Sequence, residues 1–182
     1  MLTIITLITF SALMLWAAYS DLTRYILPNR LCLAAALLYP IFLFALYIDG
    51  NGLPLQDILI SVAISISIFA VCASFFALNI MGGGDVKLIP VVALWAGATH
   101  VLSYLFITSL TGGLVAIAII VINRRNRSKY SKSSGNINLS MAEKKINAVP
   151  YGIGIAIGGL YVAYQLFTAL NLENNLKVAF TG

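Results

Sequence analysis

Two aspartates in this chain stand beside long apolar segments, where a carboxylate is costly to keep. Asp85 follows three glycines in the segment Met81-Gly82-Gly83-Gly84-Asp85-Val86-Lys87-Leu88, and apolar runs flank this segment. Asp21 stands at the end of the first apolar run, and the chain has only six acidic residues in total. Ionisable residues at or near a bilayer are rare and usually serve a function. Asp21 and Asp85 are therefore the first candidates for a shared catalytic site.

Two carboxylates at one site can hydrolyse a peptide bond without a nucleophilic side chain. One takes a proton from water, while the other donates a proton to the carbonyl oxygen or the leaving amine. The two groups need different protonation states, and their mutual repulsion separates them. Asp21 is predicted near the C-terminal end of a helix and Asp85 near the start of another, so helix dipoles would leave the shared proton more often on Asp21. The two are expected to titrate as a coupled pair.

The composition is that of an integral membrane protein. The chain is 60% hydrophobic and 9% charged, whereas soluble domains carry about 25% charged residues. Its formal charge of +5 is concentrated in short segments between apolar runs, which favours contact with anionic membrane lipid and argues against nucleic acid. Cys32 and Cys72 lie within apolar runs and His100 is the only histidine, so we predict no metal site and no cofactor.

The apolar runs predict an all-α, polytopic fold in a single integral-membrane domain, residues 1–182. A spanning helix needs about 20 mostly apolar residues. The stretch from Leu88 to Asn123 is uncharged and too long for one crossing, so we expect a turn near Gly97-Ala98-Thr99-His100. The last helix is rich in glycine, which permits close helix packing. Six transmembrane helices are expected at about 1–20, 31–48, 58–81, 85–98, 101–123 and 149–171, with a basic cytoplasmic loop at 124–148.

The distribution of basic residues orients these six helices. The positive-inside rule assigns segments rich in Lys and Arg to the cytoplasm. One set of alternate connections holds all but one of the eleven basic residues, and Lys177 is the exception. Both termini are therefore predicted outside the cytoplasm, and Asp21 and Asp85 both fall on the cytoplasmic side. The basic residues of that side are Arg24, Arg30, Lys87, Arg124, Arg125, Arg127, Lys129, Lys132, Lys144 and Lys145.

Each aspartate also has a simpler structural interpretation. Asp85 could pair with Lys87 or cap the fourth helix, because aspartate is a common N-cap residue. Asp21 could form an interfacial pair with Arg24. Gly82, Gly83 and Gly84 permit positive φ and close backbone approach, so they could form a groove wall for an extended peptide.

Three segments of the chain resemble motifs of the type IV prepilin peptidases, a family of polytopic aspartyl proteases. Gly82-Gly83-Gly84-Asp85-Val86-Lys87-Leu88 is similar to the family's GxGD motif. Asp21 with Leu27-Pro28-Asn29 resembles its first motif, in which isoleucine is usual at the position of Leu27. Pro150-Tyr151-Gly152-Ile153-Gly154-Ile155-Ala156 is similar to the segment that opens the last helix. The match is to the short, CpaA/TadV-like branch, and no counterpart of the paired CxxC motifs of longer members occurs here.

The resemblance implies that the protein removes the basic leader from prepilin or pseudopilin precursors on the cytoplasmic side, without methylating the new terminus. It implies that Asp21 and Asp85 are the catalytic pair and that Gly82, Gly83 and Gly84 form the substrate-binding loop. Pro28, Asn29 and Lys87 are expected to support the motifs. The oligomeric state stays open.

Three other functions are compatible with parts of this pattern. Another GxGD intramembrane protease is disfavoured by the short chain and the first motif. A small transporter or channel with a carboxylate relay would place its carboxylates near the membrane midplane and would contain inverted repeats, which we do not detect. A non-catalytic membrane component of a pilus or secretion assembly would tolerate replacement of both aspartates.

Overall fold

The computed structural model describes residues 1–24, 27–130 and 151–181, and these residues contain helices and turns but no strand. Five helices within these ranges are long and apolar enough to cross a membrane. The predicted all-α membrane fold is therefore confirmed. The helices are α1 (Leu2–Arg24), α2 (Asn29–Ile48), α3 (Leu55–Ala77), α4 (Asp85–Tyr130) and α6 (Gly152–Thr181).

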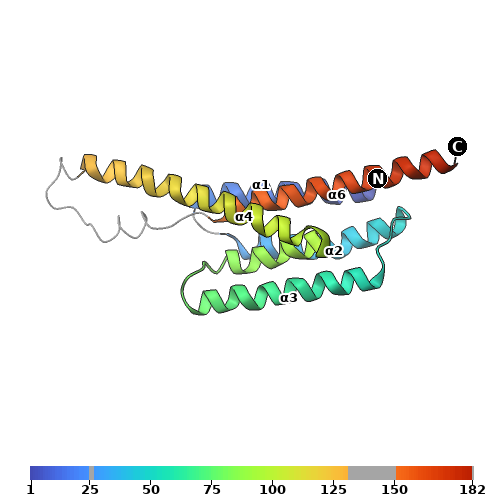
Figure 1. Ribbon diagram of the computed structural model, residues 1–182, viewed down its shortest axis with the longest axis horizontal. Helices are drawn as coiled ribbons and strands as arrows, with labels where there is room; N and C mark the ends of the chain where they lie inside the picture. Colours follow the sequence, from blue (N-terminus) through green and yellow to red (C-terminus); the bar gives the residue numbers. More distant parts are fainter. Residues whose placement is uncertain (25–26, 131–150, 182) are drawn as a thin grey trace.

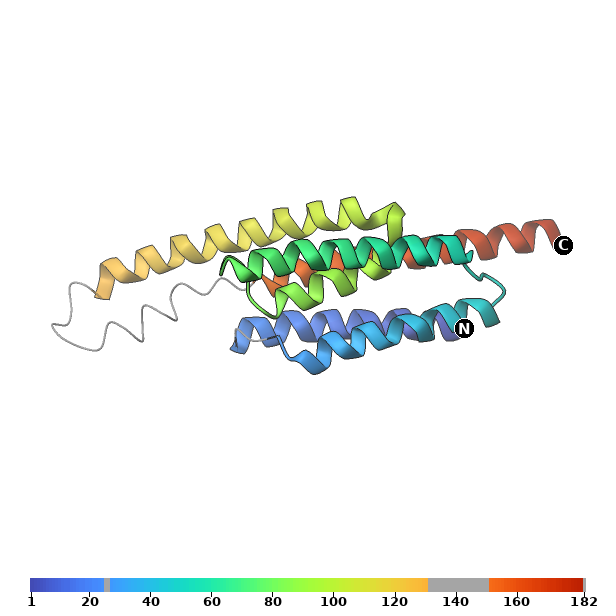
Figure 2. The ribbon, with the colours of Figure 1, turned by 90° about the horizontal axis from the view of Figure 1, so that it is seen from below.

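The fourth helical element, α4, bends sharply at Gly97, where the backbone is not helical (φ 59°, ψ −172°). Figures 1 and 2 show the chain reversing direction at this bend, so that α4 has a first arm (residues 85–96) and a second arm (residues 98–130). We predicted two separate helices joined by a turn. The reversal is present, but helix resumes at once after Gly97 and His100 lies in the second arm. The described part of the chain thus contains five candidate spans instead of six.

Several helices begin or end away from the predicted positions. α4 continues to Tyr130, so residues 124–130 are helical and are not part of a loop. Arginine and lysine are good helix formers, and hydropathy locates the end of an apolar run but not the end of a helix. Residues 131–148 of the predicted basic loop lie outside the described residues. α6 likewise extends to Thr181, beyond the predicted end at 171.

The third helix ends at Ala77, short of the predicted 81, because its C-terminus is closed locally. Asn79 adopts a positive φ of 57°. The N–H of Ile80 then bonds the carbonyl of Phe75 at 3.0 Å, and the N–H of Asn79 bonds that of Phe76 at 2.9 Å. This is a Schellman motif, which satisfies the last carbonyls of a helix. It frees residues 80–84 to form the connection to Asp85.

The helices form an elongated bundle in which both termini lie at one end. Figures 1 and 2 place the start of α1 and the far end of α6 at that end, and the α3–α4 connection with Asp85 at the other. At the terminal end, Asp49 Oδ2 accepts hydrogen bonds from Thr3 Oγ1 (2.7 Å) and the N-terminal ammonium (2.9 Å). These bonds hold the pKa of Asp49 below its usual range, and the bond from Thr3 has the largest effect. The contact fixes α1 against the α2–α3 connection.

The last helix packs closely against α1 and α4 through its glycines, as predicted. A methyl group on Gly154 would come within 2.8 Å of the backbone nitrogen of Gly112 in α4, and one on Gly159 within 2.6 Å of Met14 Sδ in α1. Small residues of this kind let helix backbones approach in membrane proteins. The core beneath includes Trp95, whose ring stacks on Phe10 at 4.2 Å and whose Nε1 donates to the Ala35 carbonyl at 3.1 Å.

Candidate active site

Asp21 lies in the last turn of α1 and its carboxylate is bound to the beginning of α6. The side chain is buried, with 6% of the residue exposed. Its Oδ2 accepts a hydrogen bond of 2.7 Å from the backbone N–H of Gly152, the first residue of α6. The free N–H groups at a helix start bind anions, so the first and last described helices meet at this carboxylate.

This contact changes the expected distribution of charge between the two aspartates. We predicted that the C-terminal end of α1 would disfavour an anion at Asp21. The structure adds the N-terminus of α6, whose N–H groups and dipole stabilise negative charge at the same carboxylate. A direct hydrogen bond from the backbone acts over a shorter distance than the dipole of α1. This bond stabilises the carboxylate form at Asp21 and so opposes the effect of the α1 dipole. Which of the two aspartates holds the shared proton more often stays a prediction.

The observed position of the Asp21 carboxylate requires glycine at position 152. A methyl group there would come within 2.7 Å of Asp21 Oδ2 and 2.8 Å of Asp21 Cγ. Both distances are shorter than nonbonded contacts allow, so the carboxyl group would have to move. Sequence analysis linked Gly152 to a family motif and to helix packing, but it did not foresee a contact with Asp21.

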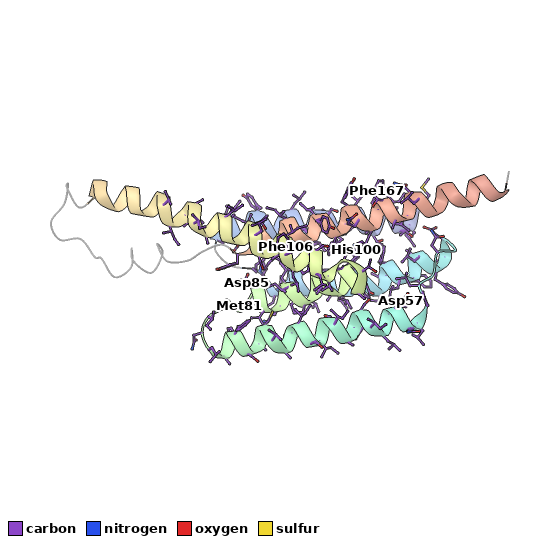
Figure 3. The ribbon with its side chains drawn as sticks, viewed as in Figure 1. Asp57, Met81, Asp85, His100, Phe106 and Phe167 are labelled. Atoms are coloured by element: carbon purple, nitrogen blue, oxygen red, sulfur yellow. The ribbon has the colours of Figure 1, made fainter. Side chains whose placement is uncertain are left out.

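Asp85 is the first residue of α4 and borders a cavity of about 280 Å³. The cavity lies between the end of α3, both arms of α4 and the start of α6. Figure 3 places Asp85 beside Met81 at the end of the molecule opposite the termini. The described residues of its walls are mostly apolar, and Asp85 is the one ionisable side chain among them apart from the phenol of Tyr151. Asp85 is thus the carboxylate that a molecule in this cavity would meet.

The two aspartates, predicted as one pair, lie at the same end of the bundle. The start of α6 links them, because Gly152 binds the Asp21 carboxylate and its neighbour Tyr151 lines the cavity that Asp85 borders. They differ in surroundings, because Asp21 is bound to a helix start while Asp85 faces the cavity. Unequal surroundings of this kind separate the protonation states of paired carboxylates.

Neither aspartate forms the ion pair that the simpler interpretations proposed. Among the described residues, the one ion pair joins Asp49 to the N-terminal ammonium. Lys87 Nζ instead donates to Asn29 Oδ1 at 2.9 Å. The pairings of Asp85 with Lys87 and of Asp21 with Arg24 are therefore not formed. The lysine side chain connects the α3–α4 segment to the start of α2, so the two predicted supporting residues contact each other.

The connections that precede α2 and α4 pack against each other at Leu27 and Gly84. A methyl group on Gly84 would come within 2.7 Å of Leu27 Cβ, whereas one on Gly83 would meet only the ring edge of Phe76 at 3.3 Å. Pro28 is the N-cap of α2, with an extended ψ of 132°. The α-carbon of Gly84 thus faces a protein side chain instead of an open groove.

The torsion angles of the loop glycines differ from our expectation. Among the described residues, the glycines with positive φ are Gly50 and Gly97, so Gly82, Gly83 and Gly84 are not there for left-handed torsions. A methyl group on Gly82 would lie 3.3 Å from Asp85 Oδ2. Close packing against Leu27 explains the glycine at position 84, and the nearby Asp85 carboxylate limits the space for a side chain at position 82.

Asp85 is the one predicted site residue among those that line the cavity, and the residues not predicted include Thr108, Ser109, Tyr151 and Ile155. Thr108 and Ser109 stand in the middle of an uncharged run, where a hydroxyl is unremarkable. Tyr151 and Ile155 belong to the segment that opens α6, whose resemblance to a family motif was the available signal. Within the residues that the structure describes, no group of three or more His, Cys, Asp or Glu side chains could hold a metal ion.

Fold and site together define a multi-pass membrane protein with two interacting carboxylates at one end of a helical bundle. The sequence model of the type IV leader peptidase family matches residues 8–117, more than half of the chain. The protein belongs to this family and is a peptidase by that membership. The matched segment contains Asp21 and Asp85, while Gly152 lies beyond it. No curated protein and no solved structure matches the chain in the same comparisons.

Proposed function

We propose that this protein is an aspartic endopeptidase of the cytoplasmic membrane that removes the basic leader from type IV (Flp-like) prepilins or related pseudopilins. One observation carries the proposal. Asp21 and Asp85, from helix ends far apart in sequence, lie close enough for their charges to interact beside an apolar cavity. Membership of the leader peptidase family supplies the substrate class.

The proposed topology counts the two arms of α4 separately, which gives six membrane helices. The first arm, residues 85–96, is shorter than a full crossing, so α4 would enter the membrane and return to the same side. Both termini would then lie outside the cytoplasm and the site near its cytoplasmic face. The shared position of the N-terminus and the end of α6 at one end of the bundle supports this arrangement (Figures 1 and 2). Large apolar side chains such as Phe44, Ile66 and Phe106 are between 61% and 69% exposed, which suits contact with membrane lipid.

The mechanism follows from the unequal surroundings of the two carboxyl groups. The Asp21 carboxylate, held by the Gly152 N–H, takes a proton from a water molecule as its oxygen attacks the scissile carbonyl. Protonated Asp85, facing the cavity, donates its proton to the carbonyl oxygen, which gives a tetrahedral diol. Asp85 then takes a proton back from one diol hydroxyl as the C–N bond breaks, and Asp21 gives its proton to the leaving amine. Both carboxyl groups end in their starting states.

The loop and supporting residues have proposed roles in holding this geometry. Gly82 and Gly83 are exposed and are the part of the substrate-binding loop that a locally unwound peptide could reach. Gly84 fixes the loop against Leu27. Pro28, Asn29 and Lys87 keep the starts of α2 and α4 in register. The proposed partners are the precursor and membrane lipid.

We also propose that the protein belongs to the short branch of the family and leaves the new amino terminus unmethylated. Its two cysteines, Cys32 and Cys72, are both buried in helices and form no CxxC pair. Mass spectrometry of the processed product would detect the added mass of a methyl group. An unmethylated product is expected, and a methylated one would contradict this part of the proposal.

The test is processing of candidate precursors co-expressed with the wild type and with Asp21→Asn and Asp85→Asn variants. Each variant keeps the shape of the side chain but removes the carboxylate, so leader removal, followed as a gel shift, should fall at least about 1000-fold. The matched control is Asp57→Asn in the first turn of α3, at the opposite end (Figure 3), which should process normally. Full processing by both Asp21→Asn and Asp85→Asn would falsify the two-aspartate mechanism.

The protonation assignment needs a separate measurement on purified enzyme. A coupled pair with one proton gives a bell-shaped dependence of kcat/KM on pH. A kcat/KM that stays constant on both the acidic and the basic side of the expected optimum would rule out a shared proton. A carboxylate-selective label on the free enzyme would test the assignment directly, because the proposal expects Asp85 to be the protonated member.

A further inference from the structure

Exposed apolar side chains border the cavity beside Asp85. Ile80 and Tyr151 stand at its rim and are 70% and 50% exposed, and Phe75 is 43% exposed. In contrast, Ile155 is 1% exposed and forms part of the interior wall. An entrance bordered by exposed apolar side chains admits a ligand from the membrane more readily than a charged ligand from water.

The size of the cavity limits what it can hold. A volume of about 280 Å³ is at the small end of ligand pockets, and it suits one or two side chains. A substrate helix that rests against the rim could project a side chain into it.

The chemistry of the walls selects an apolar side chain. Met81, Ile89 and Ile155 supply apolar surface, and Thr108 and Ser109 supply hydroxyls. Among the described residues that line the cavity there is no lysine or arginine, and the one carboxyl group belongs to Asp85. Burial of a charged side chain without a partner costs several kcal/mol, so the basic leader is excluded from this cavity and must leave Asp85 in another direction.

We infer that this cavity binds the apolar side chain immediately after the scissile bond, and that the substrate helix docks laterally against the end of α3, the second arm of α4 and the start of α6. The inference rests on the proposed function, in which an apolar helix follows the cleaved bond. Asp85 borders the cavity, so a side chain bound there places the scissile bond, with its carbonyl oxygen, beside the proposed acid. The cavity would thus determine both specificity and the position of the cleaved bond.

A pair of matched variants tests the specificity. Ser109 lines the cavity and is exposed, so Ser109→Phe would fill the cavity without disturbing the interior. Ser103 is also exposed in the second arm of α4 but does not line the cavity, which makes Ser103→Phe the control. Precursors carrying Phe, Ala or Asp after the scissile bond are compared by kcat/KM. The wild type should cleave the Phe precursor at least about tenfold faster than the Asp precursor.

The expected result is a reversal of size preference in one variant only. Ser109→Phe should lower the Phe/Ala ratio of kcat/KM at least about tenfold, while Ser103→Phe keeps the wild-type ratio. An unchanged ratio in Ser109→Phe, with cleavage retained, would overturn this inference and leave the proposed function standing. Failure of the wild type to cleave any leader-bearing precursor would instead remove the proposed function.

Photo-crosslinking decides the case in which Ser109→Phe is inactive on all precursors. A photoreactive amino acid is introduced at Ile80, on the cavity rim, or at Leu37 in α2, which is 58% exposed and does not line the cavity. Both are placed in the Asp85→Asn background, so that bound precursor is not consumed. Capture of the precursor helix from position 80 and not from 37 is expected. Equal capture from both, or capture from 37 alone, contradicts lateral docking at the proposed face.

Discussion

Asp21 Oδ2 accepts a 2.7 Å hydrogen bond from the backbone N–H of Gly152, although 131 residues separate them. The bond joins the last turn of α1 to the first turn of α6. A carboxylate held by a backbone donor keeps its orientation without the entropy loss of fixing a second long side chain. The geometry of the proposed site therefore depends on how α6 packs against α1 as well as on the connection that leads into α4 at Asp85.

Gly152→Ala is expected to abolish leader cleavage while the bundle stays folded. The added methyl group would overlap Asp21 Oδ2 and Cγ, so it would displace the carboxylate that we propose as the base. Overpacking of this kind costs about 1–3 kcal/mol of stability, and a misplaced catalytic group costs about 100-fold in rate. Processing assays and thermal unfolding in detergent measure the two effects separately.

Gly113→Ala provides the control for this prediction. Gly113 lies in the second arm of α4, and a methyl group there would meet nothing within 4 Å. Alanine is favoured over glycine inside a helix by about 0.5–1 kcal/mol, so this variant should be as stable as the wild type or slightly more stable, with normal cleavage. Normal cleavage by Gly152→Ala would show that the position of Asp21 is not critical.

The three loop glycines are predicted to differ in their tolerance of alanine. Gly84→Ala would bring its methyl group within 2.7 Å of Leu27 Cβ, which no side-chain rotation can move away. Gly83→Ala would meet only the tip of the Phe76 ring at 3.3 Å, and that ring can turn. We expect Gly84→Ala to reduce processing at least about tenfold and Gly83→Ala to process nearly normally. Equal loss in both variants would favour a direct role of the whole loop in substrate binding.

The hydrogen bond between Lys87 and Asn29 is expected to couple the two loops weakly. Its donor and acceptor belong to exposed residues, and a typical hydrogen bond contributes about 0.5–1.5 kcal/mol net. Single variants Lys87→Met and Asn29→Ala should each lower kcat/KM several-fold, and the double variant should lose no more than the worse single one. A double-mutant cycle on kcat/KM measures this coupling. Fully additive losses would mean that the two residues act independently.

The two candidate aspartates could be predicted because carboxylates are rare beside membrane-spanning segments. Asp21 and Asp85 stand out since few carboxylates occur near apolar runs, and the placement of Lys and Arg then assigned both to one side. Their spatial association is consistent with that reasoning. The contact with Gly152 could not be predicted, because no local rule relates residues so distant in sequence.

Helix ends were less predictable than helix positions for a physical reason. Hydropathy marks the part of a helix that crosses lipid, whereas backbone hydrogen bonding continues through charged residues, as in α4 beyond residue 123. The end of α3 depended on the positive φ of Asn79, a signal that a search for apolar runs does not use. The reversal at Gly97 was located correctly, but not the resumption of helix directly after it.

Gly97→Ala is expected to destabilise the bundle by weakening the reversal between the two arms of α4. Gly97 has φ 59° and ψ −172°, a region essentially confined to glycine, where a residue with a β-carbon pays about 1–3 kcal/mol. A methyl group would also lie 3.3 Å from Ser61 Oγ, so the helix packed alongside would have to yield slightly. The melting temperature measured in detergent should therefore fall by several degrees. Gly113→Ala serves again as the reference, since both positions lie in α4 but only Gly97 has a positive φ. A melting temperature for Gly97→Ala equal to that of Gly113→Ala would mean that the bend relaxes into a conformation open to any residue.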